Sequence, residues 1–438
     1  MGHLGNLKDG QKLLLQRLDA GQVGLPEPDD PQARKGWLEI LNILFSTEDA
    51  WLASRLPNMP SKLEDIVKRT KIKAEDLLPR LNALADKGIV MDIVNPRTKK
   101  VLYILAPPVV GFIEFSMMRV SDSIPKKQMA LALDAYVHGD RTFTDEIFGT
   151  DTVIGRALVH ETALQEDQLP HILDWESTTE LIKKSRNIAV TNCYCRHRAE
   201  HLGKKCDTPL EICISLDAGA DYIVSRKFGR KIDRPEAMDL LEQSRSGGLV
   251  QIADNVMNRP TYICNCCSCC CGQLQAIKEY DLEAVNPSNY QATVTVDSCR
   301  GCSRCARVCP VEAIVMKPYP QVANRKNQLL PQINTNRCLG CGICVSACGK
   351  NQAMKMEARK VRPYVSKNSI ERTIRMALEK GRLAHLMFDQ GAGRGSKFLN
   401  KVVKGICSLP KMDKIIASEQ LKSRFVKFAL KRINDPSV

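Results

Sequence analysis

The sequence predicts a multidomain α+β protein, and three patterns along the chain indicate it. First, helical runs of apolar residues near the N-terminus give way to two short apolar runs on either side of a polar turn. Second, strand-like and helical segments alternate through a cysteine-rich middle region. Third, a set of four cysteines recurs 39 residues later in the chain. A chain of 438 residues is long enough for two to four domains with their own cores.

The nineteen cysteines of the chain point to metal binding. Such a count is typical either of a secreted disulfide framework or of metal chemistry. The first residues lack a basic segment followed by a long apolar one. The longest apolar stretch, residues 101–113, contains two prolines and is too short to span a bilayer. We therefore expect a cytoplasmic protein in a reducing compartment, with its thiols available to metals.

Residues 36–115, which follow a polar lead-in over residues 1–35, have a helical pattern. Residues 38–56 read as one helical stretch with an apolar face. Ser61 and Glu64 have the spacing of a capping box, which predicts that a short helix begins there.

A helix from Ala74 to Gly88 and a hairpin of residues 89–94 and 101–105 are expected to complete this region. The order helix, helix, helix, hairpin resembles the winged helix-turn-helix fold. That fold implies DNA binding, but the expected recognition helix opens with two acidic residues and carries only two cations. A helix that reads a DNA groove needs positive charge to meet the phosphates. We therefore expect protein docking or homodimer formation here in preference to DNA binding.

Residues 116–184 read as a helical connector without a motif, and its histidines, His160 among them, are expected to be ordinary hydrogen-bonded side chains. The next region, residues 185–285, reads as a small α/β domain. Asp233 predicts a helix start, since it is followed by a proline and an acidic residue. The expected strands are residues 188–190, 212–216 and 249–252.

Two cysteine motifs of the same spacing lie within residues 290–357. The first is C-x-x-C-x-x-C-x-x-x-C-P and the second is C-x-x-C-x-x-C-x-x-x-C-G. This bacterial-type pattern binds iron–sulfur clusters. The segment is identified as a member of the two-cluster [4Fe–4S] ferredoxin family. Zinc sites favour paired C-x-x-C knuckles over such a run of four cysteines.

The resemblance implies which cysteine binds which cluster, because in this family the fourth cysteine of each motif binds the cluster of the other. One cluster then takes Cys299, Cys302, Cys305 and Cys348. The other takes Cys338, Cys341, Cys344 and Cys309. Gly301, Gly340 and Gly342 are expected to let the backbone pass close to the sulfides. The second motif departs from the family at Gly349, where proline is usual.

The middle domain holds ten further cysteines, six of them within eight residues. They are Cys193, Cys195, Cys206, Cys213, Cys264, Cys266, Cys267, Cys269, Cys270 and Cys271. Neighbouring side chains on an extended backbone point to opposite faces, so the crowded run can supply two clusters, one on either side. Alternatively, adjacent thiolates bridge one unusual, non-cubane cluster, or a dithiol exchanges with a disulfide. We expect one or two further iron–sulfur clusters here.

Arg196 and His197 directly follow the C-x-C pair of this domain. A cation beside a thiolate cluster stabilises its negative charge and raises its potential, so we interpret both residues as neighbours of a cluster that do not bind metal. The C-x-C-R, C-D-x-P-L-E-x-C and C-N-C-C-x-C-C-C elements, followed by the ferredoxin motifs, also resemble a family of iron–sulfur proteins from strict anaerobes. That resemblance implies electron transfer.

The C-terminal region, residues 358–438, is expected to be a basic helical tail. From Asn351 to the end, 20 Lys and Arg stand against 7 Asp and Glu, which accounts for most of the net charge of +15. Residues 369–380 predict one helix and residues 415–433 a basic amphipathic one, which suits an anionic membrane or an acidic partner. Cys407 is expected to be a plain buried thiol.

The leading hypothesis is an iron–sulfur electron-transfer protein, in which two ferredoxin clusters relay single electrons to or from the cysteine-rich domain and redox proteins are the partners. One alternative is a reductase subunit that reduces a small substrate or disulfide at an unusual cluster of the middle domain. Another is a redox-sensing transcription regulator, which the acidic start of the recognition helix disfavours. Of these, the sequence favours an electron-transfer component over an enzyme.

Overall fold

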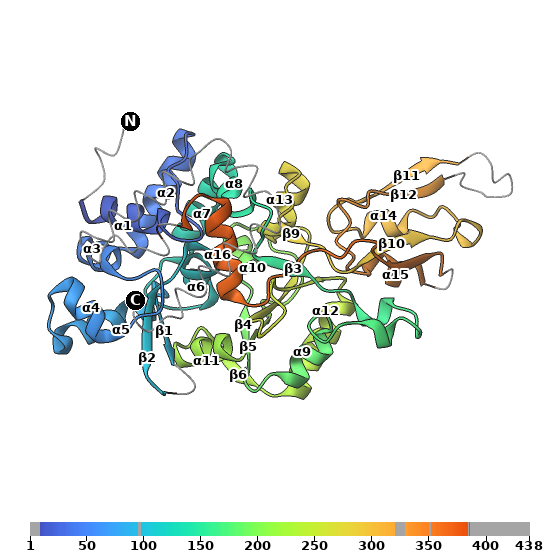
Figure 1. Ribbon diagram of the computed structural model, residues 1–438. Helices are drawn as coiled ribbons and strands as arrows, with labels where there is room; N and C mark the ends of the chain where they lie inside the picture. The colour runs from blue at the N-terminus through green and yellow to red at the C-terminus, as the bar shows by residue number, and fades with distance from the viewer. Residues whose placement is uncertain (1–8, 95–97, 320–328, 350–351, 384, 386–438) are drawn as a thin grey trace. The chain divides into compact units, whose positions relative to one another are not determined.

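The chain forms two compact units in the computed structural model (Figure 1). One comprises residues 1–152 together with 369–438, and the other comprises residues 153–368. The structure describes residues 9–94, 98–319, 329–349, 352–383 and 385. No helix in these residues is both long and apolar enough to cross a membrane. Three predicted features lie outside the described residues: the turn at 95–97, Cys407 and the helix at 415–433.

Three helices open the first unit: α1 (Asp9–Asp19), α2 (Pro31–Leu44) and α3 (Thr47–Arg55). The single helical stretch predicted over residues 38–56 is wrong, because the chain leaves helical geometry at Phe45, where φ is −124° and ψ is 113°. Ser46 then caps α3. Its hydroxyl accepts a hydrogen bond from the backbone N–H of Asp49 at 3.0 Å, and the Asp49 carboxylate accepts one from the Ser46 N–H. This capping box satisfies N–H groups that the helix itself leaves without partners.

The next elements come in the predicted order. They are α4 (Leu63–Thr70), α5 (Ala74–Asp86) and the antiparallel strands β1 (Val90–Val94) and β2 (Val101–Leu105). The capping box predicted at Ser61 is wrong, since α4 begins after Lys62 without a side-chain cap. Ser61 instead pairs with Tyr103 of β2, through N–H···O bonds of 3.0 and 2.8 Å in the two directions. Because the backbone N–H and carbonyl of Ser61 both pair with Tyr103, Ser61 belongs to this short β-bridge and does not cap the helix.

The remaining helices of the first unit are α6 (Ile113–Met118), α7 (Lys126–Gly139), α8 (Thr142–Phe148) and α16 (Ser369–Glu379). α2 packs closely against α7, because a Cβ at Gly36 would lie 2.5 Å from the backbone oxygen of Ala132. α16, drawn in orange-red in Figure 1, is the first helix predicted in the tail. Lys380 and Arg382 just after it form ion pairs of 3.0 and 2.6 Å with Glu146 of α8.

A seven-stranded sheet forms the main part of the second unit, and its strand order is β6-β4-β5-β8-β7-β3-β9. Neighbours run antiparallel except β3 and β9, which are parallel. The strands are β3 (Gly155–Ala157), β4 (Ile188–Asn192), β5 (Glu211–Leu216), β6 (Gly229–Ile232), β7 (Val250–Asp254), β8 (Tyr262–Cys266) and β9 (Val285–Asn286). Three of them match the predicted strands, whereas β3 lies in the segment expected to be a helical connector.

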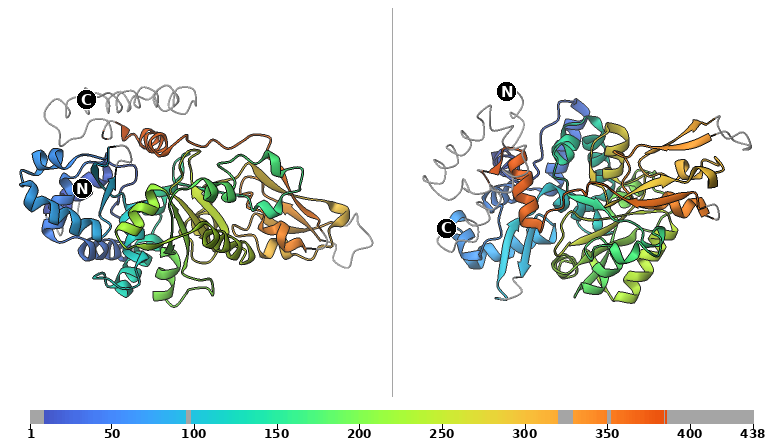
Figure 2. Two further views of the ribbon diagram at one scale, coloured as in Figure 1. Left: turned by 90° about the horizontal axis from the view of Figure 1, so that it is seen from below. Right: turned by 45° about the vertical axis from the view of Figure 1, so that its right-hand side comes forward.

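Five helices accompany the sheet, and Figure 2 shows them around its strands. They are α9 (Thr178–Lys184), α10 (Tyr194–His201), α11 (Ala218–Ser225), α12 (Arg234–Ser246) and α13 (Gly272–Tyr280). α12 begins as predicted, since Asp233 caps it by accepting a hydrogen bond from the Glu236 N–H at 2.9 Å. Buried aliphatic side chains such as Ile182, Val190, Ile214 and Leu241 join the helices to the sheet.

The two cysteine motifs form a smaller layer after the sheet. β10 (Tyr290–Val294) pairs with β13 (Met354–Ala358), and β11 (Ile314–Pro318) pairs with β12 (Leu329–Ile333), both antiparallel. Two short helices, α14 (Arg304–Arg307) and α15 (Ile343–Cys348), carry the third cysteine of each motif. The repeat in the sequence is therefore a repeat in the structure, of a cysteine loop, a short helix and a strand.

Candidate metal centres

The eight cysteines of the repeat gather around two cavities. One is lined by Cys299, Cys302, Cys305 and Cys348, which we call the outer group. The other is lined by Cys309, Cys338, Cys341 and Cys344, the inner group. Each cavity thus meets three cysteines of one motif and the fourth of the other, which is the arrangement that the ferredoxin resemblance implies.

Glycines shape the loops of both motifs. Gly301, Gly340 and Gly342 all have positive φ, at 65°, 67° and 87°, a region that side chains with a Cβ avoid. Gly349 also has a positive φ, of 59°. Proline fixes φ near −65° and cannot adopt this conformation. The second motif therefore has glycine at position 349, where the family usually has proline, because the turn that ends α15 requires a positive φ there.

The inner group lies in a more apolar setting than the outer group. Val311, Ile314 and Met356 line its cavity, and burial raises the pKa of the Cys341 thiol to about 12. In the outer group Cys302 is exposed, and the backbone N–H and guanidinium of Arg304 lower its pKa. Thiols buried away from water become thiolates when a bound metal supplies positive charge. Both groups suit iron–sulfur clusters, since each offers the four cysteine sulfurs that a [4Fe–4S] cluster takes as ligands.

The cysteine-rich domain brings six of its thiols into a closed ring. We call this the six-thiol ring, and its members in order around the ring are Cys193, Cys195, Cys271, Cys266, Cys264 and Cys213. Each thiol is in side-chain contact with the two beside it. The thiols arrive from the end of β4, from α10, β5 and β8, and from the residue that precedes α13. The sheet order explains the meeting, because β4, β5 and β8 are adjacent strands.

The other four cysteines form a separate group. We call it the four-thiol site, and it comprises Cys206, Cys267, Cys269 and Cys270. Cys206 belongs to the loop after α10, and the other three belong to the turn between β8 and α13. Cys269 is exposed and Cys206 is half-buried, whereas the remaining two are buried.

The alternation predicted for the crowded run accounts for this division. Cys264 and Cys266 are two residues apart on β8, so they share a face and both join the six-thiol ring. Cys267 faces the other way and joins the four-thiol site with Cys270, whereas Cys271 returns to the ring. One run of cysteines therefore supplies two distinct groups of thiols.

Arg196 is a buried cation that interacts electrostatically with thiols of both groups. Its side chain is fully buried, and one Nη2–H donates to the carbonyl of Asn265 at 2.7 Å. Its Nε and Nη1 have no partner among the described residues. Burial alone would lower the pKa of Arg196, but the charges of Cys193 and Cys267 raise it. A buried cation with free N–H groups beside many thiols indicates that an anionic group completes the site.

His197 lies on the same helix and is also buried. Its Nε2 is 3.1 Å from Nε2 of His201, and their rings are 4.8 Å apart. The i, i+4 spacing thus brings the two histidines against each other.

Hydrogen bonds link the ferredoxin motifs to the sheet domain, and two of them reach the inner group or the residue next to it. Ser268, within the crowded run, donates to the carbonyl of Pro310 at 3.0 Å, next to Cys309 of the inner group. His160 donates its backbone N–H to the carbonyl of Cys341 at 2.9 Å, and its ring is bonded to the carbonyl of Leu249 at 2.9 Å. The sequence carried no signal for these contacts, and they place the inner group beside the thiol-rich domain.

Residues 298–352 match the family model of the 4Fe-4S dicluster domain. The chain carries a ferredoxin-type dicluster domain. It is similar to a methylamine utilization ferredoxin-type protein of Paracoccus denitrificans, with 25% identity over 96 residues, which is 20% of this chain and 43% of that protein. It is also 39% identical over 59 residues to an uncharacterized polyferredoxin-like protein of Methanocaldococcus jannaschii, covering 13% of this chain and 35% of that protein. No solved structure matches the chain.

The chain spans less than half the length of these curated relatives. The family match and the ferredoxin-type relatives together support an iron–sulfur electron-transfer role. The cysteine-rich domain lies outside the residues that the family model covers.

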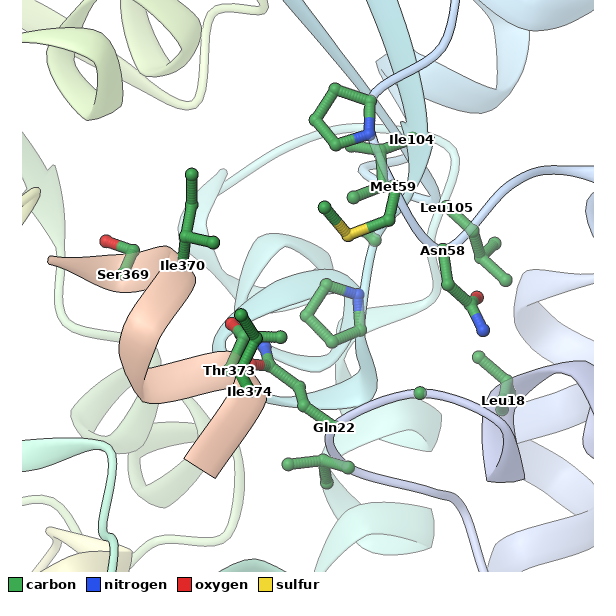
Figure 3. Close-up of a pocket in the computed structure, with 15 residues that line it drawn as sticks. Leu18, Gln22, Asn58, Met59, Ile104, Leu105, Ser369, Ile370, Thr373 and Ile374 are labelled. Atoms are coloured by element: carbon green, nitrogen blue, oxygen red, sulfur yellow. The ribbon is translucent and has the colours of Figure 1, made fainter. Parts of the chain in front are cut away.

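A pocket in the first unit carries no comparable chemistry (Figure 3). Leu18, Met59, Leu105 and Ile374 line it, and none of its 15 lining residues is charged or a cysteine or histidine. All the cysteines in the part of the chain that the structure describes lie in the second unit.

Proposed function

We propose that this protein relays single electrons between the two clusters of its dicluster domain and a further iron–sulfur cluster held by the six-thiol ring. In this relay, the outer group exchanges electrons with a redox protein partner. The inner group passes them to or from the cysteine-rich domain. The observation that carries the proposal is the ring itself, in which six thiols meet beside a fully buried arginine.

The ring has more ligands than one cubane needs. A cubane takes four thiolates, so six converging thiols favour a larger or otherwise non-cubane cluster. Such a cluster is anionic, and its sulfurs can accept the N–H groups of Arg196 that have no protein partner. Hydrogen bonds with Cys193 and Cys271 lower the pKa of Cys195, and Arg198, buried on the same helix, adds a second positive charge that acts in the same direction.

The contacts between domains support the direction of the relay. The Ser268 and His160 hydrogen bonds both reach residues of the inner group or next to it. The outer group, by contrast, includes an exposed ligand, Cys302. Electrons entering at the outer group would therefore meet the inner group before the thiol ring.

The test is a redox titration of the full chain, purified without oxygen and followed by electron paramagnetic resonance. Arg196→Met should lower the midpoint potential of the ring cluster by tens of millivolts, since the reduced cluster loses a neighbouring cation. The dicluster signals should not move. Arg234→Met, a change at the start of α12, is the matched control.

A second arm of the test uses cysteine variants. Cys264→Ser should remove the acid-labile sulfide beyond the about eight that two cubanes contain, together with the iron bound to that sulfide. Cys341→Ser should leave the ring cluster in place. When a light flash photoreduces the cluster of the outer group in this variant, the electron should no longer reach the ring cluster. The proposal fails if the parent protein holds only eight irons and eight sulfides, or if the ring cluster is reduced equally fast without Cys341.

A further inference from the structure

Four thiols of the cysteine-rich domain converge more tightly than the rest. The sulfur atoms of the four-thiol site all lie within 4.8 Å of one another. The Sγ–Sγ distance is 3.6 Å between Cys206 and Cys267 and 3.6 Å between Cys269 and Cys270. In the part of the chain that the structure describes, this is the one group of three or more Cys, His, Asp or Glu side chains that is so compact.

The size of the group decides what it can hold. Four thiolates around one tetrahedral ion, at a metal–sulfur distance of about 2.3 Å, lie ~3.8 Å from one another. In a cubane each thiolate binds a different iron, so the four ligand sulfurs stand farther apart. The inner and outer groups provide an internal comparison. No three of their thiols lie within 4.8 Å of one another, and the described residues include all eight.

We propose that the four-thiol site binds one tetrahedral metal ion, Zn²⁺ or Fe²⁺, through four thiolates, and holds no iron–sulfur cluster. This inference does not rest on the relay, because it concerns different cysteines. Binding would release the thiol protons to solvent, as thiolate ligation requires. Four thiolates and a divalent ion leave two negative charges, and Arg196 partly offsets them from beside Cys267.

The position of the site gives the ion a structural consequence. It would tie the loop after α10, through Cys206, to the turn that precedes α13. That turn also carries Ser268, whose hydroxyl is bonded to Pro310 of the dicluster domain. Gln275 of α13 donates to the carbonyl of Cys269 at 2.9 Å, and this hydrogen bond joins the turn to α13. A bound ion would therefore fix the surface on which the inner group rests.

The experiment measures zinc, iron and acid-labile sulfide per chain in the full-length protein purified without oxygen. Cys269→Ser changes the exposed ligand, so it disturbs packing least. We expect it to remove one ion per chain and no sulfide. Cys264→Ser, in the six-thiol ring, is the matched control and should keep that ion. Loss of several irons together with sulfide in Cys269→Ser would show a cluster there and overturn the proposal.

A second measurement needs no variant. If the ion is zinc, X-ray absorption at the zinc edge of the parent protein should show four sulfurs at about 2.3 Å and no iron neighbour. If the ion is iron, mild oxidation should produce the high-spin ferric signal of a single tetrathiolate iron. Finding neither, or finding a Cys206–Cys267 disulfide by mass spectrometry of alkylated protein, would contradict the proposal.

Discussion

Gly340 shows at the level of one residue why the second cysteine motif needs glycine. Its φ is 67°, and a Cβ there would lie 2.0 Å from the backbone oxygen of Tyr290 and 2.3 Å from the hydroxyl oxygen of Ser288. The sequence predicted that such glycines make room for sulfide. The structure adds a second reason, which is the close approach of a neighbouring backbone. Spacing within a motif cannot indicate this, because Tyr290 lies on β10, outside both motifs.

Gly340→Ala should therefore destabilise the dicluster domain by more than the cost of placing an alanine at a positive φ. Positive φ costs alanine about 1 kcal/mol, and the clash with fixed backbone should raise the total to ~3 kcal/mol or more. Gly203→Ala is the control, since its φ is 69° but a Cβ there meets nothing within 4 Å. Thermal unfolding and iron content are measured for both. Equal losses in the two variants would mean that the contact with Tyr290 does not matter.

At the scale of elements, the sequence analysis included the possibility that the crowded cysteines supply two groups, but it did not assign the individual cysteines or their partners. Alternation along a strand was sufficient to separate Cys266 from Cys267. The partners Cys193 and Cys213 come from β4 and β5, and they reach the ring because these strands lie beside β8 in the sheet. Strand order depends on long-range packing, which local patterns do not encode. For the same reason, the sequence analysis did not predict β3, a three-residue strand within residues 116–184.

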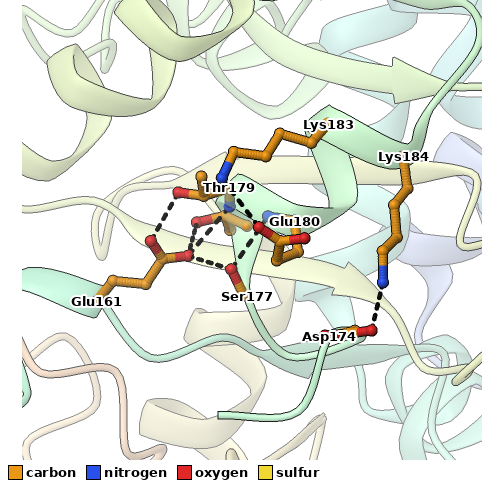
Figure 4. Close-up of polar contacts among 8 residues, drawn as sticks. Glu161, Asp174, Ser177, Thr179, Glu180, Lys183 and Lys184 are labelled. Atoms are coloured by element: carbon orange, nitrogen blue, oxygen red, sulfur yellow. Dashed lines mark hydrogen bonds and ion pairs between the residues drawn. The ribbon is translucent and has the colours of Figure 1, made fainter. Parts of the chain in front are cut away.

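The start of α9 depends on one carboxylate from another part of the chain (Figure 4). Glu161 accepts hydrogen bonds from the hydroxyl of Ser177 at 2.6 Å and from the backbone N–H and hydroxyl of Thr179 at 3.0 and 2.6 Å. Ser177 also caps the helix by accepting from the Glu180 N–H at 3.1 Å. Burial opposes ionisation of Glu161, but these hydrogen bonds outweigh it and lower the pKa of the carboxyl. An anion at a helix N-terminus is further favoured by the helix dipole.

Glu161→Gln should destabilise the protein at neutral pH by roughly 1–3 kcal/mol, because an amide replaces a carboxylate that accepts several bonds. A carboxyl whose pKa is lower in the folded state contributes stability above its unfolded pKa, here 4.5, and loses it as pH falls through the folded value. The difference in melting temperature between variant and parent should therefore shrink below pH 4.5. Glu180→Gln removes an acidic group in the first turn of α9 and its ion pair with Lys183 but none of the bonds that Glu161 accepts, so it is the control and should cost less than Glu161→Gln. A difference that stays constant with pH would contradict this account.

The electron path of the whole molecule should begin where the outer group reaches the surface. Cys302 is exposed, and Arg300, Arg304 and Arg307 beside it are exposed as well. Three cations around one ligand favour a donor or acceptor with an acidic docking surface, since complementary charge speeds encounter. From the sequence, only the strongly basic tail was expected to contact an acidic partner. The structure adds this second basic surface, at the cluster itself.

Arg300→Glu should slow reduction of the protein by an acidic reduced ferredoxin about five- to tenfold at low ionic strength, because steering by charge is reversed there. Added salt should remove most of the difference, since the interacting charges are exposed and become screened. Lys231→Glu on the edge strand β6 makes the same change in net charge and should have little effect. Reduction by a neutral photoreductant should be equally fast in both variants. If the two variants slow the ferredoxin equally, net charge and not the surface around Cys302 guides the partner.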